Sequence, residues 1–363
     1  MNIVLLLSLV IGVSAYADDI SIDSLEQEIK PAKRTEWLAL PIIFYTPETE
    51  FGGGAFAQCL IKGKKETDNP STVLPVFIYT QRNQIISSFS GEFYWNDNAN
   101  HLTGDISYIK YPDKFYGIGT NTVDSSEEDY TSKSFALELG FKRRMLPNTY
   151  AGLLYGFEHF KLSEIENGGL FDSGNIPGSN GGDLSKVLFS LVYDTRDDIQ
   201  FPLSGHLHKL TMSIYDNAIG SDYDCASLTG DFREYFQLGE SGVLAFQEYF
   251  RSTSGDVPFK IMPKLGGSEM MRGYYEGRFM DKNMYSIQSE YRQSVWWKLG
   301  FAAFAGFGDV AHNLDDFNTG DIKYSYGFGI RYNISDEYRT NIRADFGFGK
   351  DTSGFYMAFG EAF

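Results

Sequence analysis

The sequence has 363 residues, a formal net charge of −17 and an isoelectric point near 4.7, a balance that argues against binding nucleic acid because phosphates need Lys and Arg. Aromatic residues make up 16% of the chain and mean hydropathy is −0.26, yet no apolar stretch after residue 17 is long enough for a transmembrane helix. A transmembrane β-barrel reconciles these facts, because each strand shows lipid only every second side chain while the lumen stays polar.

The N-terminus predicts a cleaved secretory signal. Residues 3–13 form a short apolar run, and the following Ser-Ala-Tyr-Ala places small residues where a signal peptidase reads them. We therefore expect a signal peptide over residues 1–17, a short periplasmic leader over 18–36 and an outer-membrane barrel over 37–363. Loose helical spacing in the leader fits a short amphipathic segment or plug, and a disordered leader fits as well.

Period-two alternation and intervening turn residues divide the rest of the chain into sixteen strand-length segments. An even number is typical of bacterial single-chain barrels. The predicted fold is therefore all-β, a 16-stranded antiparallel transmembrane β-barrel. Its strands are expected near residues 37–46, 51–62, 72–81, 85–95, 101–111, 133–145, 150–162, 186–197, 206–216, 224–238, 243–254, 283–295, 299–311, 323–335, 340–350 and 354–363.

The alternation also predicts which side chains face lipid and which face the lumen. Phe328 and Phe346 belong to apolar faces and should contact lipid, whereas Asp194, Arg331 and Asp345 belong to the opposite, polar faces. Aromatic residues recur near segment ends, as interfacial girdles require. A water-soluble sandwich alternates too, but charges and glycines on strand after strand favour a hydrated lumen.

The cysteines and histidines give no sign of a chemical site. Cys59 and Cys225 lie in separate predicted strands, and we interpret both as small wall residues, with a single disulfide as the alternative. No Cys/His cluster has metal-ligand spacing, and none of the histidines lies in a nucleophile motif. We therefore expect no catalytic residue, no metal and no cofactor. The histidines are His101, His159, His206, His208 and His312.

The chain ends on Phe363, with Phe355, Met357 and Phe359 at alternate positions before it. This pattern resembles the terminal strand signal that the barrel-assembly machinery recognises during biogenesis, although Glu361 stands where an apolar residue is usual. A last strand that merely needs an apolar face explains the same residues.

Five segments along the chain carry motifs. They are residues 111–119, then Asp194, Arg196 and Asp197 followed by Gly205, then Arg272-Gly273-Tyr274, then Glu290 in a strand, and Asp309 one strand later. In this order they resemble the BamA/TamA-type outer-membrane barrels, the bacterial surface antigen family, over residues 111–363. The resemblance implies that the late extracellular loop holding the Arg-Gly-Tyr motif folds back into the barrel.

This loop predicts a structural lock. An Arg in a narrow lumen needs compensation, because an unpaired guanidinium away from bulk water is costly. Glu290 and Asp309 are the expected acceptors for the planar donors of Arg272. Gly273 would let the backbone turn tightly beside it. We expect the role to be structural and not catalytic.

The resemblance implies a barrel in the bacterial outer membrane, among its lipids, that assists protein assembly, translocation or passage of lipid or substrate. Insertase members carry periplasmic repeat domains before the barrel, and residues 18–36 are too few for even one. Two other classes stay open: an anchor or pore acting with a separate periplasmic partner, and an outer-membrane hydrolase, which ranks last. The sequence names neither a substrate nor an oligomeric state.

Overall fold

The computed structural model describes residues 35–63, 69–199, 201–335 and 340–363. The predicted signal peptide over 1–17 and the leader up to residue 34 lie outside the described residues. The first strand begins at Thr35, so the last two residues assigned to the leader belong to the barrel. Among the described residues, no helix is long and apolar enough to cross a bilayer.

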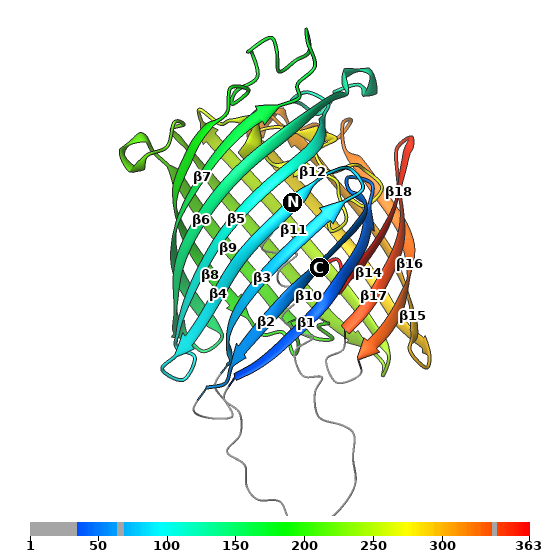
Figure 1. The fold of residues 1–363 in the computed structure, drawn as a ribbon. Helices are drawn as coiled ribbons and strands as arrows, with labels where there is room; N and C mark the ends of the chain where they lie inside the picture. The colour runs from blue at the N-terminus through cyan, green and yellow to red at the C-terminus, as the bar shows by residue number, and fades with distance from the viewer. Residues whose placement is uncertain (1–34, 64–68, 200, 336–339) are drawn as a thin grey trace, which may run out of the picture.

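The described residues form a closed barrel of sixteen antiparallel strands, which confirms the predicted fold (Figure 1). Strands adjacent in the chain pair with each other, except that β11 pairs with β14 across a long connection holding the two-stranded ladder of β12 (Lys264–Leu265) and β13 (Phe279–Met280). The barrel strands are β1 (Thr35–Thr46), β2 (Glu50–Ile61), β3 (Ser71–Thr80), β4 (Ile85–Trp95), β5 (Asn100–Phe115), β6 (Glu128–Leu146), β7 (Thr149–Ser163), β8 (Gly182–Asp194), β9 (Gly205–Tyr215), β10 (Cys225–Leu238), β11 (Gly242–Gly255), β14 (Asn283–Trp296), β15 (Leu299–Ala311), β16 (Lys323–Ser335), β17 (Thr340–Gly349) and β18 (Thr352–Phe359).

The two ends of the barrel differ. One, which we call the loop end, carries the long connections 116–127, 164–181 and 256–282; the other, the turn end, is where β1 begins (Figure 1). Residues with positive φ close several tight turns, such as Asn148 (φ 58°) between β6 and β7. Single turns of 3-10 helix lie in the loop-end connections: η2 (Asp124–Ser126), η3 (Asn217–Ile219), η4 (Phe259–Ile261) and η5 (Leu314–Asp316).

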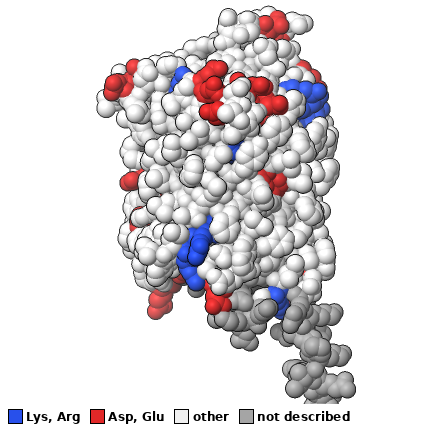
Figure 2. All heavy atoms as spheres, turned by 90° about the vertical axis from the view of Figure 1, so that its left-hand side faces the viewer, with Lys and Arg blue, Asp and Glu red and all other residues white. Residues whose placement is uncertain are grey.

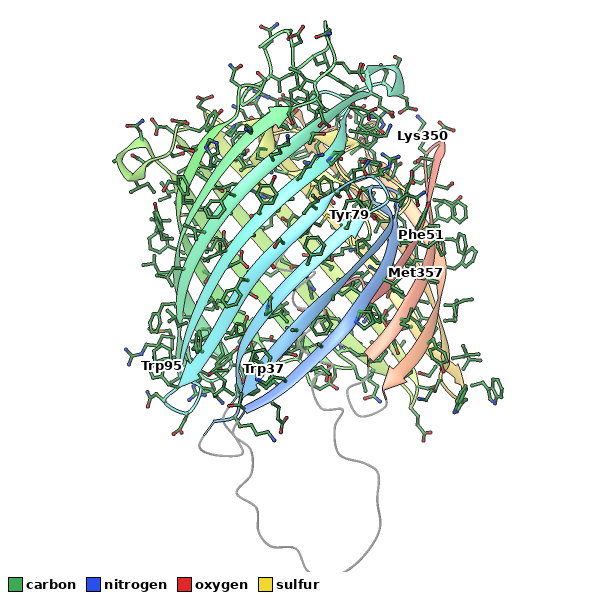
Figure 3. All side chains as sticks on the ribbon, in the orientation of Figure 1. Trp37, Phe51, Tyr79, Trp95, Lys350 and Met357 are labelled. Carbon is green, nitrogen blue, oxygen red and sulfur yellow. The ribbon has the colours of Figure 1, made fainter. Side chains whose placement is uncertain are left out.

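The outer face of the wall is apolar, as the alternation predicts. Phe328 and Ile330 are 52% and 60% exposed, whereas Arg331 is 3% exposed and Asp345 is fully buried. Figure 2 shows one side of the barrel, where uncharged atoms cover most of the middle and acidic side chains gather toward the loop end. Trp37 and Trp95 lie near the turn end, at the height where an aromatic girdle meets the membrane interface (Figure 3).

The inner face of β1–β4 departs from the expected polar lumen. Ile42, Phe44, Leu74, Ile78 and Ile86 point inward and are at most 7% exposed, forming the centre of an apolar cluster that we call the inner apolar cluster. On this part of the wall both faces are apolar, because lipid lies outside and packed side chains lie inside. The cluster also contains Phe56 and Val76, with Ile109 and Tyr111 packed against it.

A second apolar cluster lies at the loop end and joins the connections to one another. Phe171 from the 164–181 connection and Phe259 from η4 pack together, with ring centroids 4.9 Å apart. Phe115 from β5 packs against both, so the connections share one core. Both cysteines, Cys59 and Cys225, are free and buried, which agrees with small wall residues and not with the alternative disulfide.

The seam between the first and last strands is short. β1 pairs with β2 along its whole length, from Thr35 opposite Ile61 to Thr46 opposite Glu50. With β18 it pairs at a single described position, Tyr45 opposite Met357. The ribbons of β1 and β18 approach each other toward the loop end and separate toward the turn end (Figure 1).

Candidate functional site

Arg272 of the 256–282 connection lies inside the barrel and is 1% exposed. Its Nη1 donates to Asp345 of β17 at 2.6 Å, and its Nη2 donates to Glu290 of β14. The guanidinium carbon lies 3.4 Å from the centre of the Phe304 ring on β15, a stacked cation–π contact. One loop side chain therefore touches three strands of the C-terminal part of the wall.

Other arginines surround the same two carboxylates, and we call the whole group the lumen network. Arg292 Nε donates to Glu290 at 2.7 Å, and Arg343 Nη1 donates to Asp345 at 2.8 Å. Arg331 reaches both acids, at 3.3 Å from Glu290 and 2.5 Å from Asp345. Charge-assisted pairs of this kind are strong where water is excluded, provided that each charge is matched. The network comprises Arg272, Glu290, Arg292, Arg331, Arg343, Asp345 and Glu361.

The backbone beside Arg272 is docked against the wall as closely as its side chain. Gly273 has φ 116°, and a Cβ on it would lie 2.7 Å from backbone atoms of Phe348 on β17. Its N–H donates to the Tyr356 hydroxyl at 2.9 Å, and its carbonyl accepts from Thr352 at 3.0 Å. Tyr274 is 2% exposed and packs in a small apolar core of the loop. The glycine is needed because the loop backbone lies directly on the strand.

The expected second acceptor of Arg272, Asp309, was wrong. Asp309 instead accepts from Lys323 of β16 at 2.9 Å and from the Thr120 hydroxyl. The reason is position on the strand. Glu290 stands opposite Phe304, and Asp309 lies five residues further along β15, roughly 17 Å along the strand in the direction of the loop end and on the opposite face by alternation. Asp345 takes the place that the sequence analysis gave to Asp309.

The end of the chain turns into the lumen, which corrects the expectation that Phe363 belongs to an apolar strand face. β18 ends at Phe359, and Gly360 has φ 74°. Glu361 then accepts from Arg331 at 2.7 Å, and the backbone oxygen of Phe363 accepts from Arg292 at 2.7 Å. Phe363 is 5% exposed and packs inside against Tyr235 and Ala245. Glu361, which breaks the apolar alternation, is the residue that holds this turn in the network.

The remaining motif residues shape the connection between β8 and β9 at the turn end. Arg196 donates to Asp194 through Nε at 2.9 Å and Nη2 at 2.7 Å. The Asp197 carboxylate accepts from the backbone N–H groups of Leu203 and Ser204. Gly205 has φ 102°, and a Cβ there would lie 2.3 Å from the Thr195 carbonyl oxygen. These residues hold a turn, away from the lumen network.

Among the described residues, one group of His, Cys, Asp and Glu side chains has the spacing to hold a metal ion. His206 and His208 of β9 and Glu234 of β10 offer ligand atoms that all lie within 4.8 Å of one another. The sequence analysis expected no metal site, because no Cys/His cluster in the sequence has metal-ligand spacing; the third member of this group, Glu234, is a carboxylate far from the two histidines in the chain. His-x-His in a strand was the available signal, since alternate residues share a face.

Sequence reasoning missed most of the lumen network. Arg292, Arg331, Arg343, Asp345 and Glu361 all lie at inward positions of the last strands or the turn after them. Their alternation with apolar residues identified the face, and the motif identified Arg272. The cross-barrel distances that join them depend on strand tilt and register, which alternation does not give.

The comparisons with known proteins agree with this geometry. The family model described as the Omp85 superfamily domain matches residues 76–363. No curated protein sequence matches the chain. A solved structure of BamA from Haemophilus ducreyi lacking POTRA domains 1-3 has a TM-score of 0.61 at 14% identity, over 90% of this chain and 70% of that one.

Two CdiB structures are also similar. CdiB from Acinetobacter baumannii has a TM-score of 0.57 at 13% identity, with 90% of this chain and 59% of that chain covered. CdiB from Escherichia coli has a TM-score of 0.58 at 9% identity, with 89% of this chain and 63% of that chain covered. This chain thus spans less than two thirds of either CdiB chain. Such low identities show a shared fold.

The family match covers most of the barrel, including every strand from β4 onward and the whole lumen network. A closed sixteen-stranded wall and the structural likeness to BamA and CdiB barrels agree with it. The chain belongs to the Omp85 superfamily.

Proposed function

We propose that this protein is an outer-membrane barrel that assists the insertion of β-strand proteins into the membrane through the seam between β1 and β18. The observation that carries the proposal is the single paired position at that seam, Tyr45 opposite Met357. A strand edge inside a bilayer leaves N–H and C=O groups without water, so an incoming strand that pairs with them is favoured.

The chain turns inward after β18, and this leaves part of β1 without a neighbouring strand on one side. Continuing the register from Tyr45 opposite Met357 would place Glu361 opposite Pro41, but the chain has already turned inward at Gly360. The turn-end half of β1 therefore has β2 on one flank and no β18 residue on the other. Pro41 supplies no N–H, and proline in a sheet is typical of an edge strand. β1 has the features of an edge along half its length.

The lumen network supports one side of the seam only. It ties the loop to β14 and β17. The hydroxyl of Ser325 on β16 donates to the Arg272 carbonyl, and the Gly273–Tyr356 and Thr352–Gly273 hydrogen bonds extend the tie to β18. The link from the same loop to the β1 side is at the loop end, where the Glu276 N–H donates to Glu48 at 2.9 Å. β18 is therefore braced while the turn-end part of β1 is free to separate from it.

A disulfide across the seam tests the proposal. Tyr45→Cys and Met357→Cys are introduced into a chain whose Cys59 and Cys225 are replaced by Ser; facing Cα atoms of an antiparallel pair are about 4.5–5.5 Å apart, within disulfide reach. The protein is placed in lipid vesicles, and the folding rate of an unfolded barrel client is measured by its gel mobility without boiling. We expect reduced protein to speed client folding several-fold and the oxidised form to lose this effect.

A matched control cross-links two strands away from the seam. Phe328→Cys with Phe346→Cys joins facing residues of β16 and β17, which pair along their length, and its oxidation should leave the folding rate unchanged. Vesicles with reduced protein that fold the client no faster than empty vesicles would show that the insertion role is wrong. Acceleration that survives oxidation of the seam pair would show that the seam is not the route.

A further inference from the structure

His206 and His208 lie on the outer face of the wall, at the start of β9. Residues alternate along this strand, and Leu210 and Met212 on the same face are 40% and 45% exposed to the surroundings of the barrel. Glu234 of β10 stands directly opposite His206 in the register. All three polar side chains therefore emerge on the same outer face, where neighbouring strand positions are apolar. Polar groups on a lipid-facing wall carry a cost that their own hydrogen bonds only partly offset.

The three side chains converge on one point. His208 Nε2 lies 2.6 Å from Glu234 Oε1, and His206 Nδ1 contacts the other oxygen, Oε2. Two imidazoles thus share a single carboxylate, and the three side chains are between 32% and 43% exposed. In a tetrahedral zinc site, ligand atoms about 2.0–2.1 Å from the ion are roughly 3.3 Å apart. The three ligand atoms lie within 4.8 Å of one another, so rotations of the side chains bring them toward that geometry.

We propose that His206, His208 and Glu234 bind one Zn²⁺ ion on the outer face of the barrel. Two neutral imidazoles and a carboxylate are a ligand set that Zn²⁺ accepts, and three protein ligands leave a fourth position open. The rigid sheet fixes the spacing, since residues two apart on one strand and a facing residue on the next form a compact triangle. The site needs no rearrangement of the backbone.

The surroundings of the site suit a metal at the membrane interface. The ring of Tyr193 from β8 lies 6.0 Å from that of His208, and Phe232 from β10 lies 5.5 Å from it on the other side. Aromatic walls limit access of water and strengthen the ligand bonds. β4 ends at Trp95 and β9 begins at Gly205, so the site is at the turn end, the same end as Trp95 (Figure 3). The open fourth position thus lies near the headgroup level.

Other histidines show what an ordinary pair looks like in this protein. His159 lies 2.6 Å from Asp183, and His312 lies 3.2 Å from Asp281, each with one carboxylate. Within the described part of the chain, neither pair belongs to a group of three with metal-binding spacing. The β9–β10 group differs because a second imidazole reaches the same carboxylate, which is the step from an ion pair to a ligand set.

Zinc binding to the purified, folded barrel tests the proposal. The protein carries an affinity tag without histidines, is stripped with a chelator and is titrated with Zn²⁺ by calorimetry, with metal content measured after dialysis. We expect one Zn²⁺ per chain, a rise in the thermal unfolding temperature on adding the ion, and at least a tenfold loss of affinity in His206→Ala with His208→Ala. His159→Ala is the matched control, because it removes an exposed imidazole from a carboxylate pair and should bind zinc as the unaltered protein does.

Glu234→Gln is a second test variant, chosen because it keeps the size of the side chain while removing the anionic ligand. It should lose zinc affinity without disturbing the fold. Each variant is first checked for folding by its mobility on unboiled gels. Equal zinc stoichiometry and affinity in the unaltered protein, the double histidine variant and Glu234→Gln would overturn the proposal. Loss of the site in His159→Ala alone would also overturn it, since the ion would then bind elsewhere.

Discussion

The two parts of the wall that flank the seam are filled on the inside in opposite ways. On the β1–β4 side, the inner apolar cluster packs Ile42, Phe44, Ile78 and their neighbours without ion pairs among its members. On the β14–β18 side, arginines and carboxylates of the lumen network line the inner face and hold the Arg272 loop. Both groups are buried, but the inner apolar cluster is stabilised by close packing and the lumen network by the pairing of opposite charges.

The difference teaches how one barrel combines a braced edge with a movable one. A buried ion pair holds its two side chains in one relative orientation and with one partner, because a displaced guanidinium leaves unpaired carboxylates behind. Apolar contacts are less directional, so a cluster of aliphatic side chains tolerates small shifts of its strands. The last strands are therefore bound to a particular loop by matched charges inside the barrel, whereas the first strands meet that loop at the β1–β2 turn, where the Glu276 N–H donates to Glu48.

The largest expected effect comes from breaking the charged side. Arg272→Ala should lower the free energy of unfolding by about 3–5 kcal/mol, because it leaves Glu290 and Asp345 short of a donor and frees the loop. Lysine at this position keeps the charge but not the fork, so it should rescue only in part. Urea unfolding in lipid vesicles, followed by tryptophan fluorescence, measures the change.

Arg278→Ala is the control, because Arg278 belongs to the same connection but its carboxylate partner, Asp124, is exposed. It should cost less than Arg272→Ala, since the carboxylate left behind is hydrated and the other losses are hydrogen bonds to Thr122 and ring contacts. Adding Glu290→Gln and Asp345→Asn to Arg272→Ala should be less harmful than the sum of the separate changes, since the members are coupled. Simple additivity, or an Arg272→Ala variant as stable as Arg278→Ala, would contradict the lock.

A smaller effect is expected from the apolar side. Ile78→Ala removes a side chain that is 1% exposed and should cost about 2–4 kcal/mol through the cavity that it leaves. Ile43→Ala, on the outer face of β1 and 59% exposed, should cost clearly less. The same unfolding assay compares the two. Equal losses would mean that the inner apolar cluster contributes no packing energy beyond that of the lipid-facing side.

The smallest expected effect concerns an acid at the loop end that has no arginine in its hydrogen bonds. Burial, and then repulsion by Glu276, raise the pKa of Glu48 from 4.5 to about 7. The folded state therefore binds a proton more tightly than the unfolded state, and stability from this group falls as pH rises from about 4.5 to 7. Glu48→Gln should raise the free energy of unfolding at pH 8 and leave it nearly unchanged near pH 4.5.

Glu50→Gln is the comparison for that change, because Glu50 lies at the same end and pairs with Arg82 at 3.3 Å. It should give no gain at pH 8. Stability profiles between pH 4.5 and 8 distinguish the two variants. A Glu48→Gln profile that runs parallel to that of the unaltered protein would show that Glu48 does not titrate as its burial indicates.

The alternation of residues along the strands predicted which side chains face lipid, but it did not predict which side chains pack inside the barrel. Phe328 and Phe346 were placed on the lipid face because a pleated strand sends alternate residues to opposite sides. The run over residues 71–80 is apolar at consecutive positions, which is the signal of a strand buried on both faces. This pattern therefore indicates an apolar inner face on β3, whereas the sequence analysis expected a polar lumen.

The sequence predicted part of the lumen network, and the part that it missed depends on the geometry of the strands. The motif placed Arg272 and Glu290, and the need to match a buried charge correctly called for further acceptors. Asp309 and Asp345 are both buried acids on nearby strands, but they differ in height along the barrel and in the strand face that alternation gives them. Height depends on the stagger between strands, and the turn at Gly360 depends on a backbone angle; neither is visible in a residue pattern.

The short seam has a consequence for the dimensions of the molecule. The radius of a barrel follows from its strand number and shear, which are fixed when hydrogen bonds close the ring. Here the ring is closed at Tyr45 and Met357, so the wall is close to a sheet rolled until its edges touch. A slip of β1 along β18 by two residues keeps every side chain on its own face and breaks few pairs. Such a slip would change the shear of the barrel, and with it the circumference, without unfolding any strand.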